Sequence, residues 1–373
     1  MAEIDRTVST REMNDSFPNK IILQWHITDR CNYRCSHCYQ DGYEGTELDY
    51  GVLTGILAQF RDLLDGVAVR RGMRKVRGHV TITGGEPYVR SDFSRLLEHL
   101  AANREWASFG ILTNGSLIDR SAARELKSLR ASFVQVSIEG SRITHDSIRG
   151  TGAYDSAVRA LEQLAKAGMR TLISFTAHQG NYQEFPEVVE LGRRLKVWKV
   201  WSDRLIPQGS GHQLSAGRLN PEETRQFFGI MDAAREGERK RMFRKTEVTM
   251  DRALQFLIAG GKPYACQAGR GLITVMPDAS LYPCRRMPIS VGNVLATPLA
   301  ELYFESDLFR SLRDANRISE GCGHCLYKHV CRGGLRCLSY AVSGDPFAAD
   351  PGCWKARPAL HTTLLSTYQE VSA

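Results

Sequence analysis

The chain has 373 residues, of which 42% are hydrophobic and 24% charged, a composition typical of a soluble globular protein with room for two or three domains. No apolar run approaches the roughly 20 residues of a membrane span, and the start MAEIDRTVSTREMNDSF lacks the apolar core of a secretory signal, so the sequence predicts a cytoplasmic protein without a membrane partner. The formal net charge is +8, but no nucleic-acid module accompanies the basic stretches at 70–77 and 239–245, so we expect solvated faces and no nucleic-acid partner.

Stretches rich in β-forming residues alternate along the chain with stretches of helical periodicity. The predicted strands are 21–28, 80–83, 109–113, 132–138, 171–177 and 197–205. The predicted helices are 48–64, 91–104 with Ser91 and Asp92 as candidate caps, the region around 122–128, then 154–167, 183–195 and 220–241. Such alternation indicates parallel strands with right-handed crossovers, either in a partial barrel or in an open doubly wound sheet.

The polar motifs choose between these two folds. A cysteine loop follows the first strand, GGEP (84–87) the second, TNG (113–115) the third and SIEG (137–140) the fourth. Chemistry collects at the carboxyl ends of strands in a β/α barrel, so we predict an α/β fold in the form of a (β/α)6 partial barrel followed by a small cysteine-rich domain. The expected divisions are an N-terminal tail (1–19), the barrel (20–218), a helical linker (219–260) and the cysteine-rich domain with a C-terminal tail (261–373).

The ten cysteines fall into two groups. Three lie at 31–38, none at 39–265, and seven at 266–353. A reducing compartment keeps thiols free, which argues against a disulfide framework and indicates two separate metal regions.

The first group is the motif CNYRCSHCY, with Cys31, Cys35 and Cys38 separated by three and then two residues. Three thiolates can hold one iron–sulfur cluster and leave one iron with an open coordination site. Two alternatives are a buried cysteine stripe on a helix and a structural zinc site that takes His37 or a distant residue as its fourth ligand.

CxxxCxxC followed by an aromatic residue resembles the signature of the radical S-adenosylmethionine (SAM) superfamily. The resemblance implies that the three cysteines ligate a 4Fe–4S cluster whose fourth iron is chelated by SAM. It further implies that an external one-electron reductant of the flavodoxin or ferredoxin type drives formation of a 5′-deoxyadenosyl radical, which abstracts hydrogen from a substrate.

GGEP, formed by Gly84, Gly85, Glu86 and Pro87, by itself predicts only a turn whose glycines allow a close backbone approach. One β/α unit after the cysteine motif, it is similar to the second motif of the same family. The resemblance implies that its backbone and Glu86 receive the amino group of SAM.

Four further residues are implied as cofactor contacts. Asn114 and Ser137 stand at strand ends, where they can bind ribose hydroxyls or the methionine carboxylate of SAM. Arg149 is placed like family arginines that bind that carboxylate, and the alternative is a helix-capping or surface arginine. Tyr39 is expected beside the adenine, and the alternative is a plain hydrophobic cover.

The second cysteine region resembles a SPASM domain, an auxiliary-cluster extension of radical SAM enzymes, in CQAG (266–269), SLYPCRR (280–286), GN (292–293) and CGHCLYKHVCRGG (322–334). The spacing departs from the usual pattern after Cys331, and no cysteine closely follows Cys266. The alternative is a zinc ribbon, which would use four of the seven cysteines. The resemblance implies one or two auxiliary iron–sulfur clusters, one held by Cys322, Cys325, Cys331 and Cys353 and another by Cys266, Cys284 and Cys337.

The predicted activity is a radical SAM oxidoreductase that modifies a peptide or protein, by a thioether or carbon–carbon crosslink or a related oxidation. Arg285 stands where the sulfatase-maturing branch has an aspartate, which counts against formylglycine formation; Arg285 and Arg286 either steer an acidic peptide or backbone carboxylate or are exposed charges. The alternatives are a radical SAM enzyme of haem- or quinone-type cofactor biosynthesis, and a non-catalytic zinc or electron-transfer protein.

Trp201, Asp203 and Arg204 follow the sixth strand and are plausible substrate contacts. Asp203 is a candidate catalytic proton acceptor if burial raises its pKa. The alternative is a structural ion pair with Arg204 or another arginine.

Overall fold

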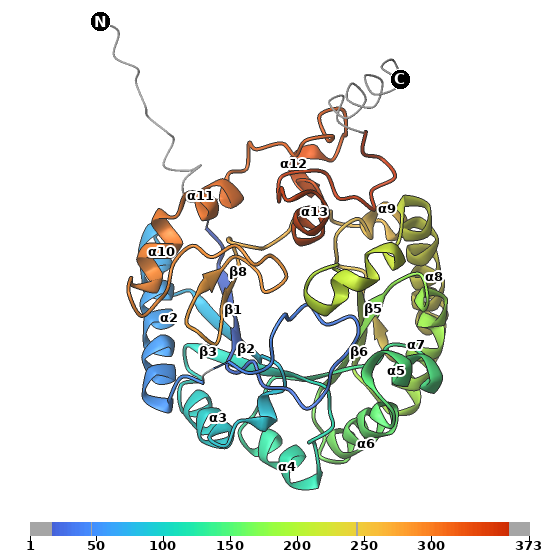
Figure 1. Cartoon of the computed structure of the whole chain (residues 1–373), viewed down its shortest axis with the longest axis horizontal. Coiled ribbons are helices and arrows are strands. Elements are labelled where there is room, and N and C mark those ends of the chain that lie inside the picture. The colour runs from blue at the N-terminus through green and yellow to red at the C-terminus, as the bar shows by residue number, and fades with distance from the viewer. Residues whose placement is uncertain (1–16, 46, 244, 358–373) are drawn as a thin grey trace, which may run out of the picture.

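The computed structural model describes residues 17–45, 47–243 and 245–357. Most of the expected N-terminal tail, Arg244 of the second basic stretch and the C-terminal tail from residue 358 lie outside the described residues. Within the described part, the helices form an outer ring around a sheet of strands (Figure 1). No helix in those ranges is both long enough and apolar enough to cross a membrane.

The six predicted strands form a parallel sheet in sequential order. They are β1 (Lys20–His26), β2 (Arg77–Thr83), β3 (Ala107–Thr113), β4 (Val134–Ser137), β5 (Thr171–Ala177) and β6 (Lys199–Arg204). Every neighbouring pair is parallel, so all six carboxyl ends lie at the same edge of the sheet.

Three short strands extend this sheet beyond the predicted six. β7 (Glu247–Val248) pairs parallel with β6. At the opposite edge, β8 (Leu272–Val275) pairs parallel with β1, and β9 (Leu281–Tyr282) pairs antiparallel with β8. The cysteine-rich region therefore continues the barrel sheet instead of forming a separate sheet of its own.

The outer helices are α2 (Tyr50–Arg70), α3 (Phe93–Ala102), α4 (Arg120–Ser128), α6 (Ala153–Lys166), α7 (Phe185–Arg194) and α8 (Pro221–Arg239). They follow their apolar spacing: α2 buries Leu53, Ile56, Leu57 and Phe60, one stripe of a 3.6-residue period. Asp92 precedes α3 as expected, but its carboxylate does not cap the helix because it accepts hydrogen bonds from Arg90.

Shorter elements connect and cover this frame. Helix α5 (Arg142–Arg149) was not predicted, since it buries only His145 and Ile148 and so leaves little apolar periodicity. The 3-10 turns are Pro87–Val89, Tyr182–Glu184 and Gly209–Gly217. The C-terminal region contributes α9 (Phe256–Ala259), α10 (Leu299–Glu305), α11 (Asp307–Arg313), α12 (Lys328–Cys331) and α13 (Arg336–Ser343).

The core joins the barrel to the C-terminal region. Trp25 of β1 is fully buried and lies in register between Ile82 of β2 and Val275 of β8, both also fully buried. Burial of a large aromatic and its neighbours contributes several kcal/mol, on the order of 2 kcal/mol for each side chain. The position of the C-terminal cysteines relative to the barrel is therefore fixed by packing.

Candidate active site

The CNYRCSHCY loop leaves the carboxyl end of β1 and lies over the edge of the sheet where the other parallel strands also end. Cys31, Cys35 and Cys38 all line one cavity there. The loop contains no helix, so the alternative of a helical cysteine stripe is wrong. The three thiols are free of disulfides.

The GGEP loop holds the cysteine loop through backbone hydrogen bonds. The amide of Gly85 donates to the carbonyl of Thr28 (2.8 Å), and the amide of Glu86 donates to the carbonyl of Arg30 (2.9 Å). A Cβ atom at Gly84 would overlap the Thr28 carbonyl oxygen, and one at Gly85 would overlap that of Arg30. The glycines are thus required for the close backbone approach that the sequence predicted, and the group approached is the cysteine loop.

Two other segments hold the cysteine loop from its far side. The amide of Gly211 donates to the carbonyl of Cys38 (2.8 Å), and the amide of Ser36 donates to the carbonyl of Ile148 (2.9 Å). Gly209 has a positive φ, and a Cβ atom there would overlap the backbone of Tyr39. Loops from three strand ends therefore fix the positions of the three thiols.

Glu86 is fully buried and is not among the residues that line the cavity. Its fully buried carboxylate accepts hydrogen bonds from the Thr113 hydroxyl (2.8 Å), the Asn114 amide (2.8 Å) and the Tyr88 amide (3.3 Å). Burial raises the pKa of Glu86 to about 7, against the effect of these hydrogen bonds. Gly84 and Gly85 line the cavity, whereas Glu86 and Pro87 do not. In this structure Glu86 therefore supports the GGEP loop through its hydrogen bonds.

The other four predicted cofactor residues, Tyr39, Asn114, Ser137 and Arg149, all line the cavity. The side-chain amide of Asn114 lies 4.0 Å from the Cys31 sulfur, and Nη1 of Arg149 lies 3.8 Å from the Cys35 sulfur. Polar hydrogen at these distances stabilises thiolate charge. Arg149 ends α5, so its position depends on a helix that the sequence did not reveal.

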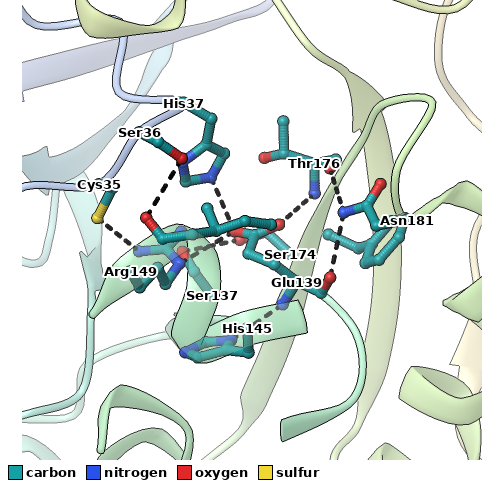
Figure 2. Close-up of polar contacts among 12 residues, drawn as sticks. Cys35, Ser36, His37, Ser137, Glu139, His145, Arg149, Ser174, Thr176 and Asn181 are labelled. Atoms are coloured by element: carbon teal, nitrogen blue, oxygen red, sulfur yellow. Dashed lines mark hydrogen bonds and ion pairs between the residues drawn. The ribbon is translucent and has the colours of Figure 1, made fainter. Parts of the chain in front are cut away.

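A buried glutamate that the sequence analysis did not single out organises this wall of the cavity (Figure 2). The Glu139 carboxylate accepts from Arg149 Nη2 (2.5 Å) and from the Thr176 amide (2.8 Å), and its Oε1 lies 3.1 Å from His37 Nε2. Burial alone would raise the pKa of Glu139, but attraction to Arg149 and His37 outweighs burial and holds it well below its ordinary value. Glu139 stands inside the quoted SIEG motif, yet nothing local shows that an acidic residue there meets His37.

The cavity fits the cofactors that the resemblance implies. Among the described residues, no three His, Cys, Asp or Glu side chains converge as closely as a single metal ion requires. The three thiols instead stand around the cavity, and soft thiolates suit an iron–sulfur cluster. Burial raises the pKa of Cys31 to about 11, so binding of the metal must displace a proton. Hydrogen-bonding side chains continue the lining from the strand ends, namely Thr83, Thr113, Gln135, Ser137, Ser174 and Thr176.

Asp203 of β6 lines the same cavity but is unsuited to accept a proton. Its Oδ2 accepts from Arg252 Nη2 (2.7 Å) and from Arg286 Nη2 (2.8 Å). Burial alone would raise its pKa, yet the two guanidiniums outweigh burial and hold the pKa well below the ordinary value. Asp203 is therefore part of a structural ion pair and is not the predicted base. Its partners are Arg252 and Arg286, whereas Arg204 pairs with Asp350 (2.6 Å). Trp201 lines the cavity and donates to Gln135 (3.0 Å).

The seven C-terminal cysteines lie in two groups, and the clusters that each group holds stay a prediction. Cys284 and Cys337 share a hydrogen bond, and Cys266 lies close enough to act on the charge of both. That hydrogen bond, aided by the nearby Arg286, lowers the pKa of Cys284 to about 5. The second group lines one small cavity and consists of Cys322, Cys325, Cys331 and Cys353.

Comparison with known families agrees with this geometry. The model of the radical SAM superfamily matches residues 25–192, and that of an iron–sulfur cluster-binding domain, SPASM, matches residues 266–326. The mycofactocin maturase MftC of Mycobacterium tuberculosis is 30% identical over 355 residues, which cover 91% of this chain and 85% of that protein. The Fe-coproporphyrin III synthase of Methanosarcina barkeri is 26% identical over 361 residues, covering 90% and 88%.

Solved structures share the fold. Streptococcus suis SuiB bound to S-adenosylmethionine matches with a TM-score of 0.70 at 17% identity, covering 91% of this chain and 78% of that one. SuiB bound to its precursor peptide SuiA matches with a TM-score of 0.68 at 16% identity, covering 90% and 75%.

Proposed function

The chain belongs to the radical SAM superfamily and carries a SPASM region, and from this premise we propose that it modifies a peptide or protein substrate. The family requires a 4Fe–4S cluster and SAM, and the SPASM region requires auxiliary iron–sulfur clusters. Together the cluster and SAM supply a radical that abstracts hydrogen from a substrate. We propose an external one-electron donor of the flavodoxin or ferredoxin type.

We propose specific tasks for the residues of the cavity. Cys31, Cys35 and Cys38 hold the cluster, and Gly84 and Gly85, which line the cavity, face SAM with their backbone. Asn114, Ser137 and Arg149 orient the nucleotide and its carboxylate, while Tyr39 covers it. Glu139 holds Arg149 in place, and Glu86 holds the GGEP loop from below.

One observation supports the proposal that the reaction is a net oxidation of the substrate. Cys31, Cys35 and Cys38 line the cavity together with Arg285 and Arg286, which directly follow Cys284 of the first auxiliary group. A substrate in the cavity would lie between the two thiol groups. The nearer auxiliary cluster could therefore accept the electron that remains after a crosslink or oxidation, which a net two-electron oxidation requires.

The shape of the site supports a peptide. The inner cavity adjoins a second one, and four residues, Tyr39, Gln40, Tyr43 and Arg285, line both. The path runs outward between the cysteine loop and the segment 276–288, so an extended chain can place one residue at the radical while its neighbours occupy the outer cavity. The maturase likeness, at 30% identity, supports the same substrate class.

A second candidate substrate is an iron porphyrin. Iron coproporphyrin III is the named product of a relative that matches 90% of this chain, and another relative, which matches 92%, is named AdoMet-dependent heme synthase, so both names belong to the haem-type cofactor class.

The test begins with anaerobic reconstitution with iron and sulfide, followed by SAM and dithionite. Two substrates are compared: the peptide of a short open reading frame beside this gene, and iron coproporphyrin III. We expect 5′-deoxyadenosine, and a peptide product lighter by two hydrogen atoms in the mass spectrum. Conversion of the porphyrin with an unchanged peptide would refute the peptide proposal.

A further inference from the structure

We propose that Arg285 binds a carboxylate group of the substrate, an inference that rests on the proposed function of this cavity. Four arginines line the inner cavity: Arg149, Arg204, Arg285 and Arg286. Buried or half-buried guanidiniums are expected to have anionic partners, because an uncompensated charge is costly to remove from water. The partners of the four therefore show which cation is available to a ligand.

Three of the four are paired with carboxylates of the chain. Arg149 pairs with Glu139 (2.5 Å), and Arg204 forms two hydrogen bonds to Asp350 (2.8 and 2.6 Å). Arg286 pairs with Asp203 (2.8 Å). Each of these pairs joins two different segments of the fold, so each has a structural task.

Arg285 has no carboxylate partner within the described ranges of the chain. Its Nη1 lies 3.4 Å from the Thr83 hydroxyl, a long contact, and its guanidinium lies 5.2 Å from the centre of the Tyr39 ring. Its Nε is buried without any hydrogen-bond partner. Burial, together with the positive charge of Arg285, lowers the pKa of neighbouring His26 to about 3, so His26 adds no second charge.

An anionic ligand would satisfy this group. A planar guanidinium presents parallel N–H donors that match the two oxygens of a carboxylate, and such charge-assisted pairs are stronger than neutral hydrogen bonds. The buried Nε would also gain the acceptor that it lacks. The guanidinium also lies over the ring of Tyr39, a cation–π contact that holds it near this wall of the cavity.

The place of Arg285 favours the substrate over SAM as the source of the carboxylate. Arg285 lines both the inner and the outer cavity, whereas Gly84, Asn114, Ser137 and Arg149 line the inner cavity alone. A molecule that enters through the outer cavity therefore meets Arg285 before it reaches these four residues. The carboxylate can be the C-terminus or an acidic side chain of a peptide, or a propionate of a porphyrin.

The test measures binding without reductant, in reconstituted protein saturated with SAM. One pair of ligands is an N-acetylated tetrapeptide library with free C-terminal carboxylates and the same library as C-terminal amides. The second pair is iron coproporphyrin III and its tetramethyl ester. The variants are Arg285→Gln, Arg285→Lys and the control Arg286→Gln, which removes the same charge one residue away and leaves Asp203 paired with Arg252. Iron content and SAM affinity are measured for each variant to confirm a folded, loaded site.

We expect the unmodified protein to bind the free acid of at least one pair about tenfold or more tightly than its amide or ester. Arg285→Gln should abolish this preference, Arg285→Lys should retain part of it, and Arg286→Gln should keep it. The pair that shows the preference identifies the carboxylate source.

Three results would overturn the inference: no preference for either acid in the unmodified protein, a preference that survives Arg285→Gln, or a loss confined to SAM affinity. These differ from failure of the proposed function. An acid that binds through Arg285 but is not modified on reduction contradicts the function and supports the inference. A peptide that is modified, and whose free acid still binds more tightly than its amide in Arg285→Gln, supports the function and contradicts the inference.

Discussion

Replacement of Glu139 by glutamine tests whether one buried carboxylate organises the cofactor wall. Glu139 is fully buried, and the side chain of its partner Arg149 is 11% exposed. Glutamine keeps the shape and one acceptor oxygen but leaves the guanidinium without a counterion. Removing one partner of a buried pair costs roughly 3–5 kcal/mol, so we expect the unfolding free energy to fall by that amount. We also expect SAM affinity to fall by about tenfold or more, because Arg149 loses its anchor.

The matched control is Asp155→Asn, which breaks the ion pair between Asp155 of α6 and Arg142 of α5, the helix that Arg149 ends. Both side chains are about half exposed there, 46% and 55%, and water screens an exposed pair, so its loss should change stability much less than the loss of Glu139. Urea unfolding of the reduced apoprotein and isothermal titration with SAM are the two assays. The reasoning is refuted if Glu139→Gln lies within about 1 kcal/mol of the unmodified protein and binds SAM equally well.

We also expect the stability difference between the unmodified protein and Glu139→Gln to depend on pH. The pKa of Glu139 lies well below its ordinary value of 4.5, so its ionised form stabilises the fold at neutral pH. That stability is present above pH 4.5 and is lost as the pH falls toward the folded-state pKa. The difference in stability between the unmodified protein and Glu139→Gln should therefore shrink below pH 4.5. A difference that stays constant through this range contradicts the assignment.

Three further substitutions test the rest of the site. Gly85→Ala should lower the iron bound after reconstitution, because its Cβ would overlap a backbone carbonyl of the cysteine loop, whereas Gly55→Ala on α2 has open space and should bind iron normally. Glu86→Gln should have the same thermal stability as the unmodified protein at pH 5, and the same or a higher stability at pH 8. The reason is that ionisation of a buried group with a pKa of about 7 costs stability as the pH rises. A variant that is less stable at both pH values would contradict this. Asp203→Asn should destabilise the fold by roughly 3–5 kcal/mol in urea unfolding. It should leave the pH–rate profile near neutrality unchanged, because Asp203 is already ionised there. A changed profile would indicate that Asp203 transfers a proton.

The barrel and its cysteine motif were predictable because both leave local patterns. Strand and helix periods set the alternation, and the structure forms all six predicted strands in sequential order. Helix α5 was missed because its eight residues bury only two side chains, and the strand pairing of β8 with β1 was missed because four residues carry no periodic signal. The packing of the GGEP glycines against the cysteine loop was not predicted, since the sequence shows that a close approach is needed but not which group is approached.

By itself, the sequence determined the loop of three cysteines after the first strand and the place of the polar motifs after successive strands. Tertiary structure alone decided which charges meet. Arg285 and Arg286 are neighbours in the chain, yet only Arg286 reaches Asp203, which lies 83 residues away. Arg204 next to Asp203 pairs instead with Asp350, 146 residues away. Spacing along a chain records short-range geometry, whereas the partner of a buried charge is set by long-range packing, and here that packing leaves Arg285 without a carboxylate among the described residues.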